Sequence, residues 1–168
     1  MFVRPPNGWM NTTETAALTP SEFGGSLGAS ITTNGTTVVA GAPSFSKDGF
    51  AQGAAFVFVE PNGGWVNMQE TAELVATLPG WSFGQSVAID RTGHVIAVGA
   101  PSETATRMAL AMCFCSWSLL VDGRQPSIQV SSVRLGCKHG DGFGGSISLT
   151  NSTLAVGGGS AVYVFKRK

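Results

Sequence analysis

The chain has 168 residues, enough for one domain with a sizeable core, and 23 of them are glycine. Ten basic and ten acidic residues give zero formal net charge, which excludes the basic footprint of a nucleic-acid or anionic-membrane binder. The first ten residues lack the apolar core of a secretory signal, and the longest apolar run, 108–121, is interrupted by serines and too short to cross a bilayer. We therefore expect no nucleic-acid partner, no membrane span and no signal peptide in this chain.

The N-terminal region contains a phrase that returns later in the chain. Phe2-Val3 and residues 9–18 have the composition of two strands, separated by a Pro-Pro-Asn-Gly turn. The same order of residues recurs around Phe58 and Trp65, which lie 56 positions after Phe2 and Trp9. A fixed spacing between similar segments indicates a repeat architecture, so we expect the chain to begin partway through a repeat.

The first full unit begins at Phe23 and contains a predicted hairpin. Alternating apolar residues predict a strand over 27–31, and a second apolar run predicts the return strand over 38–42. Asn34-Gly35 lies between them and predicts a type I′ turn, since both central positions of that turn need positive φ. The unit continues with a polar loop over 44–53, a third strand over 54–59 and a fourth strand over 65–78.

A Phe-Gly-x-Ser start occurs three times, at Phe23, Phe83 and Phe143, and the copies lie 60 positions apart. Each start leads to a stop of small residues, Gly41-Ala42-Pro43, Gly99-Ala100-Pro101 or Gly157-Gly158-Gly159. The three stretches from Phe to the first glycine of the stop measure 18, 16 and 14 residues. Length changes of two preserve the face to which each side chain points. The pattern predicts three equivalent hairpins over 23–43, 83–101 and 143–158.

The second unit loses the repeat phrase over 108–138, where all three cysteines lie. The third unit recovers the phrase and ends with a predicted strand over 161–165. We expect 108–138 to be the least regular and least stable part of the fold. It is either a divergent insert or the product of an error in reading frame or splicing.

Phe-Gly-x-Ser followed by Gly-Ala-Pro resembles the FG-GAP repeat, the blade unit of the integrin α-subunit β-propeller. The resemblance covers 2–101 and 143–165 and leaves 108–138 poorly matched. It implies an all-β fold, a partial β-propeller of about three four-stranded antiparallel blades in a single repeat domain, 1–168. The expected parts are the end of a preceding blade over 1–22, a first repeat over 23–82, a second over 83–142 and a partial third over 143–168.

The resemblance also implies a function. We expect a non-enzymatic binding or adhesion-type module, extracellular or on a cell surface, that is a fragment of a larger FG-GAP protein. The alternative is a propeller segment of an extracellular enzyme or carbohydrate-binding protein. The ligand, whether protein or glycan, does not follow from the resemblance.

No catalytic, cofactor-binding or metal-binding residue is assigned. Many integrin blades carry a calcium loop with several carboxylates, whereas the corresponding turns here, 33–36, 90–93 and 150–153, contain at most one Asp each. A zinc site from Cys113, Cys115, Cys137 and His139 lacks the usual ligand spacing, and small buried cysteines are the favoured interpretation. Neither His94 nor His139 accompanies a nucleophile motif, so we expect no enzyme activity.

Three further features remain open. Asn11, Asn34 and Asn151 begin N-glycosylation sequons, which chance explains as well as secretion does in a chain rich in Ser and Thr. The four tryptophans can stack on sugars, but Trp9 and Trp65 occupy equivalent repeat positions, which favours packing between blades. The redox state of the three cysteines is left open.

Three blades are too few for an ordinary propeller ring, so we expect an open arc with exposed apolar faces. The N-terminal segment is a candidate for the outer strand missing from the last blade. Self-association into a six-bladed ring and further blades in a longer parent are the two expected ways to cover the exposed faces, and the second is favoured.

Overall fold

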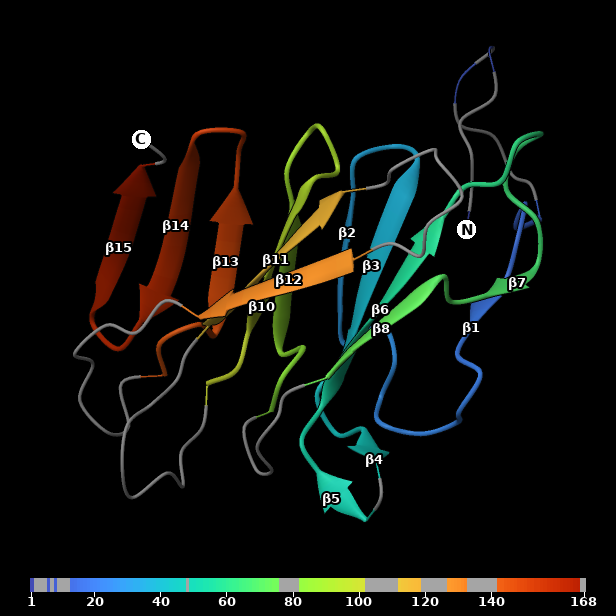
Figure 1. Cartoon of the computed structure of the whole chain (residues 1–168). Helices are drawn as coiled ribbons and strands as arrows, with labels where there is room; N and C mark the ends of the chain where they lie inside the picture. The colour runs from blue at the N-terminus through green and yellow to red at the C-terminus, as the bar shows by residue number, and fades with distance from the viewer. Residues whose placement is uncertain are drawn as a thin grey trace.

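The computed structural model describes residues 1, 6, 8, 13–47, 49–75, 82–101, 112–118, 127–132 and 142–166. The described residues form fifteen strands and no helix, so the expected all-β fold is confirmed (Figure 1). The strands are rich in β-branched, aromatic and small residues, which pack well on a pleated surface.

Three antiparallel sheets follow one another along the chain. The first sheet has the strand order β2 (Ser30–Thr33), β3 (Thr37–Ala42), β6 (Ala54–Val59), β8 (Ala72–Val75). The second sheet has the order β9 (Ser86–Ile89), β10 (Val95–Gly99), β11 (Met112–Ser118), β12 (Ser127–Ser132). The third sheet contains β13 (Ser146–Leu149), β14 (Thr153–Gly158) and β15 (Ala161–Lys166).

Two short strand pairs lie beside the first sheet. They are the parallel pair β1 (Leu18–Thr19) and β7 (Met68–Gln69), and the hairpin of β4 (Ser46–Lys47) and β5 (Phe50–Ala51). The β4–β5 hairpin lies within 44–53, which was expected to be a loop.

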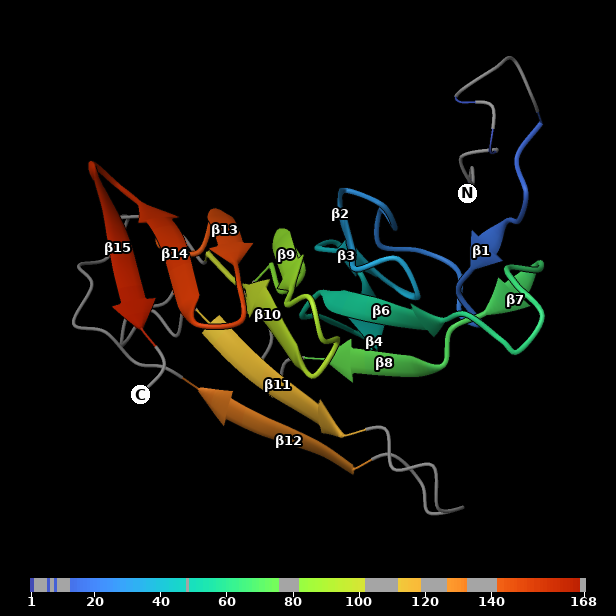
Figure 2. The ribbon, with the colours of Figure 1, turned by 90° about the horizontal axis from the view of Figure 1, so that it is seen from above.

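The sheets stack in chain order with their first strands next to one another. Strand β9 contacts both β2 and β13, and the two views show the first and third sheets on opposite sides of the second (Figures 1 and 2). Among the described strands, none of the three sheets closes on itself. The stack therefore has two ends, one at the first sheet with β1 and β7, and the other at the third sheet with β15.

Three apolar clusters form the core, and two of them lie between neighbouring sheets. The cluster between the first and second sheets contains Val39, Ala55, Val57, Leu74, Phe83, Val87, Ile89, Ile96, Val98 and Ala100. The cluster on the other face of the first sheet contains Ala16, Val38, Ala40, Ala42, Phe45, Ala54, Phe56, Phe58 and Trp65. The cluster between the second and third sheets contains Ala97, Phe143, Leu154 and Val156.

The three predicted hairpins form, but the predicted equivalence of Phe23 with Phe83 and Phe143 is wrong. Phe23 is 90% exposed, whereas Phe83 and Phe143 are each 3% exposed. Leu27 takes the position of these two phenylalanines in the first unit. The strand pairs show this, because Ser30, Ser86 and Ser146 lie opposite Gly41, Gly99 and Gly157.

The hydrogen bonds at the hairpin entrances confirm the corrected equivalence. The amide of Gly28 donates to the Gly41 carbonyl at 2.9 Å, and the amide of Gly84 donates to the Gly99 carbonyl at 3.0 Å. Leu27 already supplies an apolar side chain directly before Gly28, so strand pairing leaves Phe23 four residues outside the hairpin.

The predicted type I′ turn at Asn34-Gly35 is also wrong. Gly35 has φ of +110°, but Thr36 does not have positive φ. Gly35 and Thr36 are the central residues, and positive φ at the first of them alone matches type II′. The side chain of Asn34 fixes this register, because its Oδ1 accepts hydrogen bonds from the amides of Thr36 at 3.2 Å and Thr37 at 2.9 Å.

The predicted fourth strand over 65–78 is divided in the structure. Glu70 and Thr71 separate β7 from β8. The Thr71 amide donates to the Val57 carbonyl at 2.7 Å, and the Thr71 Oγ1 accepts from the Val59 amide at 3.0 Å. Trp65 precedes both strands and is buried in a loop at 7% exposure. Residues 76–78 lie outside the described residues.

The N-terminal segment does not complete the third sheet of its own chain. The strand expected over 9–18 is limited to β1, while 2–5 and 9–12 lie outside the described residues. β1 pairs with β7, at the opposite end of the stack from β15 (Figure 1). The amide of Met68 donates to the Ala17 carbonyl at 3.2 Å, which holds the segment there.

The divergent segment 108–138 contributes two regular strands. β11 and β12 pair with each other, and β11 pairs with β10, so the second sheet reaches four strands. The remainder of this segment lies outside the described residues.

The corrected equivalence predicts a large loss of stability from one phenylalanine substitution and almost none from another. Phe83→Ala removes a buried ring between two sheets, so we expect it to lower the free energy of unfolding by about 3–5 kcal/mol. Phe23→Ala removes an exposed ring and is expected to change it by less than about 0.5 kcal/mol. Urea denaturation of the two variants gives the comparison, and equal losses would restore Phe23 to the repeat core.

Candidate functional site: a sheet junction left open

Ser30, Gly41 and Gly84 join the first sheet to the second. The Oγ of Ser30 donates to the Gly84 carbonyl oxygen at 2.8 Å. Ser30 and Gly41 are paired across β2 and β3, and a Cβ added at Gly41 would overlap the same carbonyl oxygen. Glycine is therefore required at position 41, because the backbone of the next sheet occupies the space of a side chain.

The second and third sheets are joined in the same way. The Oγ of Ser86 donates to the Gly144 carbonyl oxygen at 2.6 Å, and a Cβ at Gly99 would overlap that oxygen. Ser86 is 8% exposed, so this hydrogen bond is shielded from water. We call this unit the sheet junction: a serine and a closing glycine on one sheet, and a glycine carbonyl from the next.

Gly84 lies in a narrow space on the first sheet, which we call the glycine seat. Its φ is +92°, and an added Cβ would overlap the Ala54 carbonyl oxygen and crowd the Ala42 amide nitrogen. Gly41, Ala42 and Ala54 thus surround Gly84. The seat excludes any side chain larger than hydrogen.

The third sheet has an equivalent glycine seat, and no described residue occupies it. Strand pairing makes Gly157, Gly158 and Ala161 the equivalents of Gly41, Ala42 and Ala54. These three residues and Ser146 line an open concavity of about 570 Å³. Its other lining residues are Gly142, Gly145, Gly159, Ser160 and Val162. Ser146 is exposed, unlike Ser86.

The apolar part of the junction is also open on the third sheet. Val162 and Val164 of β15 correspond to Ala55 and Val57 of β6, because each pair lies opposite the same positions of the middle strand. Ala55 and Val57 are fully buried, whereas Val162 is 69% and Val164 is 60% exposed. We call the surface made by Ser146, Ala155, Gly157, Val162 and Val164 the open face.

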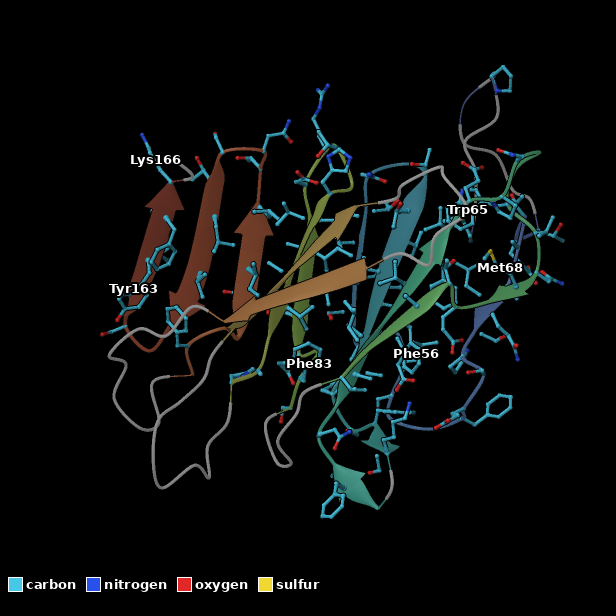
Figure 3. All side chains as sticks on the ribbon, viewed as in Figure 1. Phe56, Trp65, Met68, Phe83, Tyr163 and Lys166 are labelled. Carbon is cyan, nitrogen blue, oxygen red and sulfur yellow. The ribbon has the colours of Figure 1, made fainter. Side chains whose placement is uncertain are left out.

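The edge of β15 is open as well. β15 pairs with β14 only, whereas β6 also pairs with β8, and the described residues place no fourth strand in the third sheet. Tyr163 points to the opposite side from the open face, where its ring meets that of Phe143 at 5.2 Å. Figure 3 shows Tyr163 and Lys166 on this outermost strand, across the molecule from Trp65 and Met68.

The hairpin turns that correspond to calcium loops are held by their own side chains. Asp90 is 2% exposed, and its carboxylate accepts from the Thr92 hydroxyl at 2.7 Å and the Val95 amide at 3.2 Å. Asn34 and Thr150 stand at the equivalent positions and accept hydrogen bonds from amides of their turns. Within the described residues, no group of three metal-ligating side chains occurs.

The other candidate residues are not brought together in the described part of the chain. His94 is exposed in the turn after Asp90. Cys113 and Cys115 lie on β11, and Cys137 and His139 lie outside the described residues. Trp65 is buried against the first sheet and offers no stacking surface. Asn34 and Asn151 occupy turns, Trp117 lies on β11, and Asn11, Trp9 and Trp81 lie outside the described residues.

The sequence contained one signal for the open face: the similarity of β15 to β6. The phrase of β15 repeats that of β6, so burial in β6 shows what β15 requires from neighbours. The serine of the junction is Ser30, which pairs with Gly41. It lies four positions after Ser26, the serine of the Phe-Gly-x-Ser start at Phe23. Only the strand register reveals that the serine and the glycine act on one carbonyl.

No protein-family model matches the chain, and no curated protein matches it either. In the described part of the chain, no helix is long and apolar enough to span a membrane.

The junction predicts a position-dependent cost of adding one methyl group. Gly41→Ala forces a backbone carbonyl of the next sheet to move, so we expect a loss of about 2 kcal/mol or more in the free energy of unfolding. Gly157→Ala is the matched control, because within the chain its Cβ meets mainly the rotatable Ser146 side chain. Chemical denaturation in dilute solution measures both, and equal losses would contradict the junction.

The hydrogen-bonded turns predict that calcium does not stabilise the fold. The Asp90 carboxylate already accepts two hydrogen bonds, and each turn offers at most one carboxylate. Thermal melting in chelator and in millimolar calcium is expected to give the same midpoint. A calcium-dependent gain of about 2 kcal/mol or more, the size expected for saturating ligand, would show a site.

Proposed function

We propose that the chain is a segment of an FG-GAP-type β-propeller that acts as a non-enzymatic, adhesion-type protein-binding module in the extracellular space or on a cell surface. Three antiparallel sheets in chain order, with adjacent first strands, support the propeller. The repeated junction supports it further, because consecutive sheets meet through the same three positions.

The observation that carries the proposed function is the open face. Val162 and Val164 are exposed on a strand whose outer edge has no described partner, and an open concavity lies beside them. Contiguous apolar surface of this kind marks interaction sites in soluble proteins. A free strand edge adds backbone hydrogen bonds to the apolar contact, as in recognition by strand addition.

The polar groups of the described turns favour binding over catalysis. Both carboxylate oxygens of Asp90 accept hydrogen bonds within its own turn, and His94 is exposed in the same turn. The Asp90 carboxylate therefore has a structural role. The proposed contact surface is accordingly the apolar open face and not the row of hairpin turns.

The test uses two arrays, one of extracellular and cell-surface protein ectodomains, with this chain included, and one of glycans. We expect retention on the protein array that falls at least tenfold in Val162→Asp/Val164→Asp, because contact would bury unpaired carboxylates. Phe50→Asp is the control, since Phe50 is 58% exposed in the β4–β5 hairpin and is not part of the open face.

Retention on glycans that is unaffected by the double substitution would favour the carbohydrate-binding alternative. Absence of retention on both arrays would contradict the proposed function. Circular dichroism of each variant checks that the strands still form.

A further inference from the structure

The two ends of the stack have complementary surfaces. The end at the third sheet offers the serine hydroxyl of Ser146, the glycine seat at Gly157 and the apolar residues of the open face. The end at the first sheet offers Gly28, which is exposed, whereas its equivalents Gly84 and Gly144 are buried. One end therefore lacks the carbonyl that the other end presents.

We propose that the partner of the open face is a second copy of this chain, docked head to tail so that Ser146 donates to the Gly28 carbonyl oxygen of the other copy. This inference rests on the proposed function, since it names the protein that the open face binds. The contact would be a third instance of the junction that occurs twice within the chain.

The apolar surface of the first sheet fits this role. Ile31 corresponds to Val87, because they lie opposite Ala40 and Val98, the equivalent positions of the next strand. Val87 is 8% exposed within the cluster between two sheets, whereas Ile31 is 66% exposed. Docking against Val162 of the second copy would bury Ile31 as Val87 is buried.

β1 can supply the strand that the third sheet lacks. The amide of Thr15 donates to the Met1 carbonyl at 2.7 Å, as the amide of Thr71 donates to the Val57 carbonyl at 2.7 Å. Thr15 thus repeats the hydrogen bond of Thr71, the residue directly before β8. Leu18 corresponds to Leu74, whose strand partner is Ala55.

The same correspondence gives the register of the intermolecular contact. Val162 is the equivalent of Ala55, so it would pair with Leu18 of the second copy. Val164 is the equivalent of Val57. Met1 is also equivalent to Val57, because its carbonyl accepts from Thr15 as that of Val57 accepts from Thr71. Val164 of the docking copy would therefore replace Met1 beside Thr15 and Ala16.

The contact joins two different surfaces, so it is heterologous. Two copies that satisfy both of their ends form a closed ring of six sheets, whereas a rotation that does not close would extend into a filament. We commit to the closed pair, because every junction is then satisfied with two copies.

The test measures the mass of the unmodified 168-residue chain by size-exclusion chromatography with light scattering. We expect a dimer. Ile31→Asp damages one end and Val162→Asp damages the other, so each variant alone is expected to dissociate at least tenfold more readily. Mixed in equal amounts, the two variants retain one undamaged pair of ends and should recover a dimer.

Phe50→Asp is the matched control, because Phe50 is 58% exposed at the β4–β5 hairpin, away from both ends, and this variant should stay dimeric. Circular dichroism of every variant confirms that the fold is retained. A mixture of Ile31→Asp and Val162→Asp that stays monomeric overturns the head-to-tail contact.

Two other results also overturn the inference, and they separate it from the proposed function. Dissociation by Val162→Asp but not by Ile31→Asp would show pairing between two β15 edges. A monomeric native chain overturns self-association, and retention of that monomer on other ectodomains would leave the proposed function intact.

Discussion

The structure depends on one steric constraint: a backbone carbonyl of each sheet must enter the space that a Cβ would fill on the sheet before it. Gly41 and Gly99 leave that space empty, and Ser30 and Ser86 donate hydrogen bonds to the carbonyl that enters it. A buried carbonyl without a donor costs about 1–3 kcal/mol, so the serine and the glycine are needed together. The apolar cluster between the sheets can pack closely only because the backbones meet at this distance.

The same constraint explains why the third sheet is the candidate binding surface. A junction is satisfied only when a next sheet brings its carbonyl, its apolar strand face and an edge for the outer strand. On the third sheet Ser146 and Gly157 are in place while these three contributions are not present among the described residues. The surface is thus shaped for a backbone and not for a small polar ligand. The propeller and its protein partner are proposals that follow from this incomplete contact.

The hairpin turns tolerate variation that the junctions do not. The second hairpin is longer by two residues than the first and the third, and its extra residues lie in the turn that Asp90 holds. A change of two preserves the faces of both strands, so Ile89 and Ile96 still enter the core. Turn composition therefore differs in all three units, whereas the serine and the closing glycine recur.

The sequence by itself determined the all-β class, the three hairpins and the small-residue stops, because period-two alternation and turn glycines are local signals. It did not determine which residue takes the apolar position before the first hairpin. Phe23 matched the repeat better than Leu27, yet the pairing of Ser30 with Gly41 makes the half-buried Leu27 the equivalent of Phe83 and Phe143. The structure also decided that Ser30 and Gly41 converge on Gly84. It decided as well that the similar phrases of β6 and β15, AAFVFV and AVYVFK, are buried in one sheet and exposed in the other. Register and burial depend on contacts between distant segments, which propensity and spacing within one segment do not encode.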